Sequence, residues 1–246
     1  MSILNLRTAN FNWSILNKNT IKVIAFDADD TLWVNETIFR NAEKAFAKRF
    51  SDYFEEDEII KILLDTEIRN LETYGYGIKG FTLSLIEAAQ DITKNNITGE
   101  TLQFILDLGK QMLAEPVELI PEIEEVLKKL SKNYKLVVAT KGDLLDQERK
   151  LIKSGLIDYF HHIEIVSDKK EKQYKKLVKH LDIKPEEFLM IGNSLKSDIL
   201  PVLAMGGHAY HIPFHTTWVH EEVEDEVKHP KFKALESAKE LLDYLV

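Results

Sequence analysis

Three carboxylates and a hydroxyl follow directly after one apolar run of the chain. Residues 21–26 (IKVIAF) are nearly all apolar, which predicts a buried strand, and Asp27, Asp29, Asp30 and Thr31 come next. Ligands bind at the carboxyl ends of the strands in open parallel sheets. Because carboxylates a few ångströms apart disfavour each other's ionisation, burying such a cluster is costly without a cation. The pattern therefore predicts a metal site.

A hydroxyl, a carboxylate and several lysines follow three further segments that are predicted to be strands. Thr140 ends one run, Asp198 stands in a loop after another, and lysines follow a third: Lys169, Lys170, Lys172. A hydroxyl, a cation and carboxylates that converge on one sheet edge are what a catalytic site for an anionic substrate requires. We therefore expect these groups to share one site.

The segment after Thr31 changes from strand to helical spacing. Between about residues 36 and 115, apolar side chains recur at steps of three and four, as in the series Phe39, Ala42, Phe46, Phe50. This spacing predicts a small helical unit. Its richest turn signal is the glycine-rich loop of residues 74–80, which we interpret as a connector between two helices, with a substrate-facing loop as the alternative.

Strand and helix patterns alternate in the rest of the chain. Strands are predicted at residues 135–140, 162–166, 188–192 and 208–212, with amphipathic helices between them. Such alternation implies parallel strands joined by right-handed crossovers. We expect an α/β core of residues 1–35 and 116–246, interrupted by an all-helical cap of residues 36–115.

The composition narrows the classes of partner. The 246 residues are 44% hydrophobic, enough for a buried core, and the net charge of −9 argues against nucleic acid or an anionic membrane as the main partner. Cysteine is absent, which excludes disulfides and thiolate metal sites. The first twenty residues lack the apolar core of a signal peptide, and no stretch is long enough to span a bilayer. We expect a cytoplasmic protein.

The four polar motifs, in this order, resemble those of the haloacid dehalogenase-like hydrolases. The resemblance is to the phosphatase branch, which has an Asp nucleophile and a helical cap after the first motif, and it runs from residue 21 to about 218. It implies a Rossmann-like core, hydrolysis of phosphate esters and Mg²⁺ as cofactor. The second carboxylate of the first motif, Asp29, favours phosphate esters over carbon–halogen bonds, because the dehalogenases of the family lack it.

The residue types agree with the roles that this resemblance implies. Asp27 is placed to attack phosphorus and form an aspartyl-phosphate, and Asp29 to act as general acid and then as base. Asp27, Asp198 and the backbone carbonyl of Asp29 are the predicted Mg²⁺ ligands, since Mg²⁺ prefers oxygen donors. Asn193, where many relatives carry Asp, keeps an oxygen that can reach the metal through water. Asp30 is expected only to cap the following turn.

Phosphate binding is assigned to Thr140, to Lys141 with its neighbour Gly142, and to a lysine of the third motif. Backbone N–H groups after Thr140 form the kind of nest that favours anions. Lys169 is preferred for the third motif from its spacing, with Lys170 as the runner-up. Ordinary packing is preferred for the aromatic segment of residues 214–218, with lining of the site's entrance as the alternative. Solvent exposure is expected for the acidic stretch of residues 221–226.

We therefore predict a magnesium-dependent phosphatase of a small phosphorylated metabolite, either a sugar phosphate or a nucleotide monophosphate. Two alternatives remain: a phosphomutase, which shares all four motifs, and a non-catalytic phosphate-binding module. The scattered histidines lack the paired spacing of a zinc site. The substrate, the oligomeric state and the role of residues 1–20 are left open by the sequence.

Overall fold

A parallel β-sheet forms the centre of the molecule. The computed structural model describes residues 20–223 and 226–246, and in them six strands lie in the order β3-β2-β1-β4-β5-β6. All five strand pairs are parallel. The strands are β1 Val23–Phe26, β2 Lys135–Lys141, β3 His162–Val166, β4 Phe188–Gly192, β5 His208–His211 and β6 Phe232–Ala234.

The first strand lies in the middle of the sheet, between β2 and β4. Phe26 is in register with Val138 on one side and Ile191 on the other, so the carboxyl ends of the three strands lie close together. The predicted strands are confirmed within one or two residues at their ends. The sequence patterns missed β6, because its three residues, Phe232–Ala234, are too few to show a period of two.

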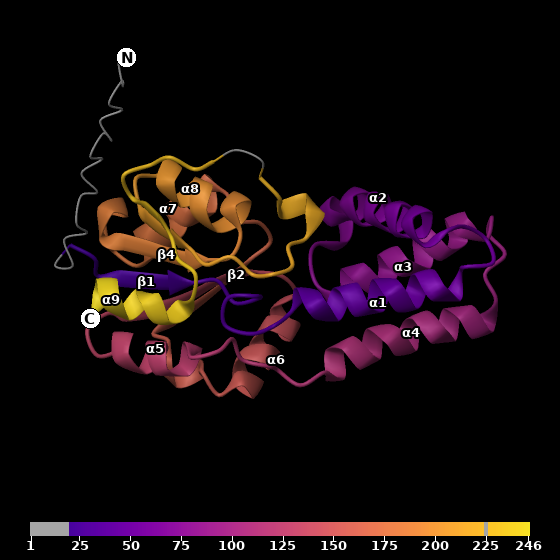
Figure 1. The fold of residues 1–246 in the computed structure, drawn as a ribbon, viewed down its shortest axis with the longest axis horizontal. Helices are drawn as coiled ribbons and strands as arrows, with labels where there is room; N and C mark the ends of the chain where they lie inside the picture. The colour runs from indigo at the N-terminus through magenta and orange to yellow at the C-terminus, as the bar shows by residue number, and fades with distance from the viewer. Residues whose placement is uncertain (1–19, 224–225) are drawn as a thin grey trace, which may run out of the picture.

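Helices cover both faces of the sheet (Figure 1). Alternate side chains of β1 point to opposite faces: Phe26 joins a cluster with α5, α6 and α9, whereas Ala25 joins one with α7 and α8. These helices are α5 Ile123–Leu130, α6 Leu144–Ser154, α7 Glu171–His180, α8 Leu200–Ala204 and α9 Leu241–Leu245. Shorter helical turns are η1 Ile157–Tyr159, η2 Pro185–Glu187, η3 Leu195–Ile199, η4 Val219–Glu221 and η5 Ala238–Glu240. The predicted α/β fold with a parallel sheet is confirmed.

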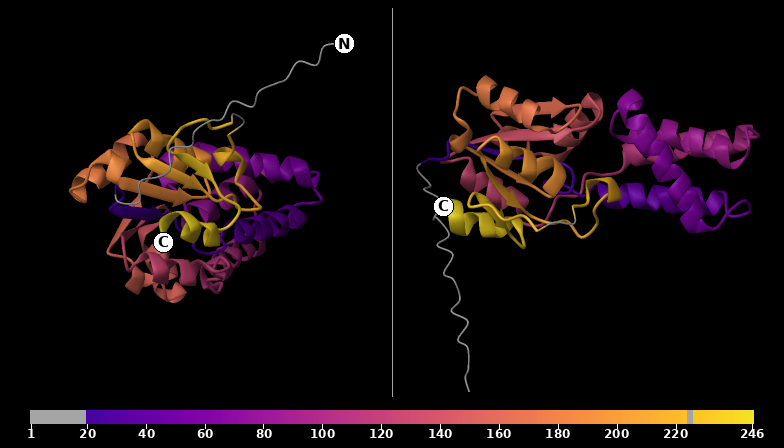
Figure 2. Two further views of the ribbon diagram at one scale, coloured as in Figure 1. Left: turned by 60° about the vertical axis from the view of Figure 1, so that its left-hand side comes forward. Right: turned by 90° about the horizontal axis from the view of Figure 1, so that it is seen from above.

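Four of the five helices between β1 and β2 form a separate cluster beside the α/β part (Figures 1 and 2). They are α1 Glu36–Arg49, α2 Glu56–Tyr74, α3 Ile78–Ile92 and α4 Gly99–Ala114. The four helices share one hydrophobic core, separate from the cores at the sheet. Each helix contributes a buried side chain to it: Phe46, Leu63, Leu85 and Ile105. Their apolar stripes therefore pack on one another rather than on the sheet.

Asp30 lies in the connection from β1 to α1 and caps the start of α1. Its carboxylate accepts hydrogen bonds from the backbone N–H of Asn35 at 2.8 Å and of Glu36 at 3.0 Å, which satisfies the first amides of α1. The predicted capping role of Asp30 is confirmed. Within residues 20–223 and 226–246, no helix is both long and apolar enough to cross a membrane.

The helical cluster depends on Phe46, which has no exposed surface and lies against Phe50 with 4.7 Å between ring centroids. We expect Phe46→Ala to lower the free energy of unfolding by about 3–5 kcal/mol, because a large cavity replaces the ring. Leu83→Ala, at an exposed position of α3, is the control and should cost less than about 1 kcal/mol. Urea unfolding measures both values, and equal costs would contradict this account of the cluster.

Candidate active site

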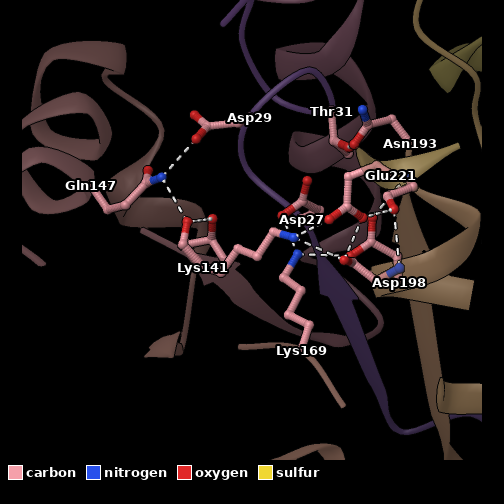
Figure 3. A network of polar contacts seen from close by, with 12 residues as sticks. Asp27, Asp29, Thr31, Lys141, Gln147, Lys169, Asn193, Asp198 and Glu221 are labelled. Atoms are coloured by element: carbon pink, nitrogen blue, oxygen red, sulfur yellow. Dashed lines mark hydrogen bonds and ion pairs between the residues drawn. The ribbon is translucent and has the colours of Figure 1, made fainter. Parts of the chain in front are cut away.

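A buried lysine lies between two carboxylates at the carboxyl edge of the sheet (Figure 3). Lys169 Nζ contacts Asp27 Oδ1 and donates to Asp198 Oδ1 at 2.7 Å, and its side chain is only 3% exposed. Lys170 instead is 76% exposed and pairs with Asp168. Of the two candidates for the third motif, the structure brings Lys169 into the site and leaves Lys170 outside it.

The electrostatics of this triad favour a charged lysine. Burial by itself would lower the pKa of Lys169, but the carboxylates of Asp198 and Asp27 outweigh it and raise the pKa above that of a free lysine. Burial raises the pKa of Asp27 to about 7; Lys169 opposes this rise and the charge of Asp198 adds to it. One ammonium therefore faces two carboxylates, and a further cation beside Asp27 would favour its ionised form.

Asp198 is held by the turn that follows β4. It lies in η3, a π-helical turn, where its Oδ2 accepts the backbone N–H of Ser194 at 3.0 Å. The carboxylate packs directly on Gly192, the last residue of β4, since a Cβ there would lie 2.2 Å from Asp198 Oδ2. The strand must therefore end in glycine for the carboxylate to occupy this place.

Oxygen atoms near Asp27 form a donor set that fits a hard cation. The amide of Asn193 faces the Asp29 carbonyl and Asp27 Oδ2; turned one way, its nitrogen donates to them at 3.3 and 3.2 Å. In the opposite orientation, Asn193 Oδ1 lies beside the Asp29 carbonyl oxygen and Asp27 Oδ2. Three oxygens so close together are favourable only around a cation. No three His, Asp or Glu side chains among the described residues are arranged to bind a metal. The predicted set contains only two carboxylate side chains, Asp27 and Asp198, because its third donor is the backbone carbonyl of Asp29; it stays a prediction.

The Asp29 carboxylate lies apart from Asp27, on the side of α6 (Figure 3). It accepts hydrogen bonds from Trp33 Nε1 at 2.8 Å, Gln147 Nε2 at 2.7 Å and Lys150 Nζ at 2.6 Å. Sequence reasoning missed Gln147 and Lys150. Their three-residue spacing on the helix after Thr140 was the available signal, but nothing in it indicates a partner 118 and 121 residues away.

Thr140 and Lys141 end β2 beside this triad. Thr140 is buried and lines the same cavity as Asp27. The Lys141 ammonium pairs with Glu221 and donates to Ser197 Oγ at 2.9 Å. It also lies 4.4 Å from the ring centroid of Tyr76, from the glycine-rich loop between α2 and α3. The side chain of Lys141 thus contacts both the core and the helical unit.

The prediction that Glu221 is a solvated surface residue is wrong. Its side chain is 10% exposed, and Oε2 accepts hydrogen bonds from Ser194 Oγ and Ser197 Oγ, each at 2.5 Å. Burial alone would raise its pKa, but Lys141 and these hydrogen bonds lower it to about 2. Local composition could not show this, because the chain returns across the site after β5. Glu222 and Glu226 are exposed as predicted, and residues 224 and 225 lie outside the described part.

One cavity of about 170 Å³ lies between the sheet edge and the helical unit. Its lining includes the polar side chains of Asp27, Asp29, Thr140, Lys141, Gln147, Lys150, Lys169, Asn193, Asp198 and Glu221. The predicted connector of residues 74–80 does join α2 to α3, but Gly75, Tyr76 and Gly77 also line the cavity. Trp218 lines it too, and packs edge-to-face on Tyr76 with 6.1 Å between centroids. Residues 74–80, predicted as a connector, and residues 214–218, predicted to pack, therefore both contribute to the cavity wall.

Acidic side chains of the helical unit form another part of the cavity wall. Glu36, Glu43 and Glu67 line it, and Arg40 pairs with Glu36 at 3.2 Å and with Glu43 at 2.9 Å. Burial raises the pKa of Glu67 to about 8, with the charges of Glu43 and Glu36 adding to the rise and Arg40 opposing it. Burial likewise raises the pKa of Glu36 to about 8.

The parallel sheet and the polar groups at its carboxyl edge define a class of protein. Comparison with known families identifies this class. Residues 21–206 match the haloacid dehalogenase-like hydrolase family. A haloacid dehalogenase-like family hydrolase from Xanthomonas campestris has the same fold, with a TM-score of 0.81 and 38% identity over 90% of this chain and 88% of that one. The chain therefore belongs to the haloacid dehalogenase-like hydrolases. The predicted family and the predicted hydrolase class are confirmed.

Curated relatives within the family are phosphatases. A glyceraldehyde 3-phosphate phosphatase from Methanopyrus kandleri is 24% identical over 73% of this chain and 78% of that protein. One from Pyrococcus furiosus is 34% identical over 86 residues, which span 32% of this chain and only 36% of that protein. These names agree with the predicted phosphoric monoester hydrolase.

The raised pKa of Glu67 predicts how stability changes with pH. Because the folded state holds this proton more tightly than the unfolded chain, with its ordinary value of 4.5, stability falls as pH rises from about 4.5 to 8. Glu67→Gln removes this titration, so the loss of unfolding free energy between pH 5.5 and 8.5 should shrink by about 1–3 kcal/mol. Glu72→Gln, on the exposed face of α2, is the matched control. The measurement is urea unfolding at pH 5.5 and pH 8.5. An equal loss of unfolding free energy in wild type and Glu67→Gln would contradict the raised pKa of Glu67.

The buried partners of Glu221 predict a large cost for its removal. In Glu221→Ala the Lys141 ammonium and two serine hydroxyls lose their acceptor, so we expect the free energy of unfolding to fall by about 2–3 kcal/mol. The adjacent, exposed Glu222→Ala should change it by less than about 0.5 kcal/mol. Thermal unfolding of both variants at pH 7 is the measurement; indistinguishable midpoints would show that the Glu221 contacts contribute nothing.

Proposed function

We propose that this protein is a magnesium-dependent phosphatase that hydrolyses a small sugar phosphate through an aspartyl-phosphate intermediate. The observation that carries the proposal is the buried contact of Lys169 with Asp27 and Asp198 at the carboxyl edge of the sheet, inside a cavity that Thr140 also lines. A nucleophilic carboxylate, a fixed cation and a hydroxyl around one cavity suit the attack on a phosphate ester.

Asp27 is the nucleophile of the first step. Its carboxylate oxygen bonds to phosphorus as the ester P–O bond breaks, and Asp29 gives its proton to the leaving oxygen. In the second step Asp29 takes a proton from water, whose oxygen bonds to phosphorus while the Asp27 P–O bond breaks and inorganic phosphate forms. The Lys169 ammonium, Thr140 and the backbone N–H groups after it hold the phosphate oxygens.

Magnesium is proposed on the oxygen donors near Asp27. The carboxylates of Asp27 and Asp198 and the carbonyl of Asp29 would hold it, with Asn193 contributing through water. When bound, the ion neutralises the carboxylates and the charge that develops on the transferring phosphoryl group. A haloacid dehalogenase-like hydrolase from Bacillus subtilis, solved bound to magnesium, shares the fold with a TM-score of 0.62 and 19% identity.

The helical unit of residues 36–115 is proposed to act as a cap. Its side chains Phe39, Tyr76 and Phe81 line the same cavity as the residues at the sheet edge. A cap in this position excludes water from the nucleophile during the first transfer and selects the substrate by its shape and charge. The core would then supply the chemistry, and the helical unit the discrimination.

The walls of the cavity favour a small substrate whose remainder carries no negative charge. Within residues 20–223 and 226–246, the cations that line it are already paired: Lys141 with Glu221, Lys150 with Asp29, and Lys169 with two carboxylates. A second phosphate would also meet the carboxyl groups of the helical unit. The volume of about 170 Å³ is below the ~300–1,000 Å³ typical of sites for larger ligands, which disfavours a nucleotide.

These features favour a triose phosphate over the alternative of a phosphomutase that uses a sugar bisphosphate. Glyceraldehyde 3-phosphate, the substrate in the names of the curated relatives, has a neutral aldehyde and hydroxyl beyond its phosphate. The other alternative, a non-catalytic module, has no need of a nucleophile and an acid–base carboxylate around one cavity. We therefore take glyceraldehyde 3-phosphate as the first substrate to test.

The decisive experiment measures release of inorganic phosphate from glyceraldehyde 3-phosphate with Mg²⁺ or with excess EDTA. We expect Mg²⁺-dependent turnover that falls about a thousandfold or more in Asp27→Asn, because the nucleophile is lost. Asp65→Asn, an exposed position of α2, is the matched control and should keep full activity. Fructose 1,6-bisphosphate and AMP should be poorer substrates. Turnover that survives in Asp27→Asn would overturn the mechanism, and no release from any ester would overturn the proposed function.

A further inference from the structure

The Asp29 carboxylate is held from three sides, and two of the donors come from one helix. Gln147 Nε2 donates to Oδ2, while Lys150 Nζ and Trp33 Nε1 donate to Oδ1. Gln147 is only 4% exposed, and Lys150 is largely buried. Neither residue belongs to the predicted phosphate-binding or metal-binding groups, yet both donate to the proposed acid–base carboxylate.

The start of α6 explains how it delivers these two side chains. Asp143 caps the helix by accepting the backbone N–H of Asp146 at 3.0 Å, and positions 147 and 150 then share one helix face. Gly142, at φ +143°, brings the chain from β2 into the helix, and a Cβ there would lie 2.9 Å from Gln147 Nε2. Glycine at this position therefore leaves room for the amide of Gln147.

Both side chains are anchored a second time. Gln147 Nε2 also donates to the Lys141 carbonyl at 3.1 Å, and Lys150 Nζ donates to Asn35 Oδ1 at 3.1 Å. Asn35 precedes α1, the first helix of the helical unit. Each donor is thus fixed to the backbone or to the connection between core and helical unit, so neither can swing freely and carry Asp29 with it.

We propose that Gln147 and Lys150 are positioning residues that fix where the carboxyl group of Asp29 points during catalysis. The inference rests on the proposed function, in which Asp29 serves two steps from one place: it gives a proton to the leaving oxygen and later takes one from water. A carboxyl group must stay within hydrogen-bond reach of both oxygens to do so. Gln147 and Lys150 form no bond to substrate and exchange no proton; they act only through Asp29.

A positioning role differs from a merely structural one in its dependence on the leaving group. An alkyl phosphate needs a proton on its leaving oxygen, whereas 4-nitrophenolate leaves without one. The second step is common to both esters. Misplacing Asp29 therefore slows both steps for glyceraldehyde 3-phosphate but only the second step for 4-nitrophenyl phosphate. Damage to the fold of α6 would slow both esters alike.

The test uses Lys150→Met and Gln147→Leu, with Lys153→Met as the control at an exposed position of the same helix. With Mg²⁺, we expect kcat for glyceraldehyde 3-phosphate to fall about 30-fold or more with KM changed less than about twofold. With 4-nitrophenyl phosphate, stopped flow should show a rapid burst of one nitrophenolate per enzyme followed by slowed turnover. Lys150→Arg, which keeps a donor and a charge, should recover part of kcat. Lys153→Met should behave as wild type.

A double-mutant cycle supplies the outcome that decides between the two roles. In an Asp29→Asn background, Lys150→Met should reduce kcat no further, because its effect passes through Asp29. An additional loss in that background, or equal losses for both esters without a burst, would overturn the positioning role while leaving the phosphatase proposal intact. No turnover by the wild-type enzyme on either ester would overturn the proposed function, and the inference with it.

Discussion

The site depends on one buried ammonium group between two carboxylates. Charges out of water are stable only when their partners are close and well oriented, so Lys169, Asp27 and Asp198 must arrive together. The sheet order makes this possible, because β1 lies between β2 and β4, and β3 pairs with β2. Each strand therefore delivers its polar end to the same edge, and a different strand order would leave the charges unpaired.

The other cations of the cavity are paired in the same way. Lys141 is held by Glu221, and Lys150 by Asp29, so the cations that line the cavity within the described ranges have fixed positions before any ligand arrives. Groups that need not reorganise during a reaction stabilise developing charge most effectively. The pairing also limits the choice of substrate, since a second anionic group would have to compete with a carboxylate for each cation.

The helical unit forms the opposite wall with a different chemistry. The charges of Glu43 and Glu36 add to the raised pKa of Glu67. Arg40 pairs with Glu36 and Glu43 and also donates to the Thr217 carbonyl of the core at 3.2 Å. Tyr76 meets Trp218 and Lys141 across the cavity. The two parts of the chain therefore touch through the side chains that line the cavity, and a ligand bound there would contact both.

The sequence alone determined the parallel sheet, the inserted helices and the edge at which the chemistry lies, because a period of two, a period of three to four and polar strand ends are local patterns. It also indicated Asp27, Asp198 and Lys169, since each follows its own strand. Only the tertiary structure decided which groups surround them. Glu221 meets Lys141 across 80 residues, and Lys150 meets Asp29 across 121. No local periodicity indicates such contacts, because they arise from how the chain crosses the edge of the sheet. The acidic stretch of residues 221–226 therefore looks like exposed surface in the sequence, although the fold brings Glu221 into the site.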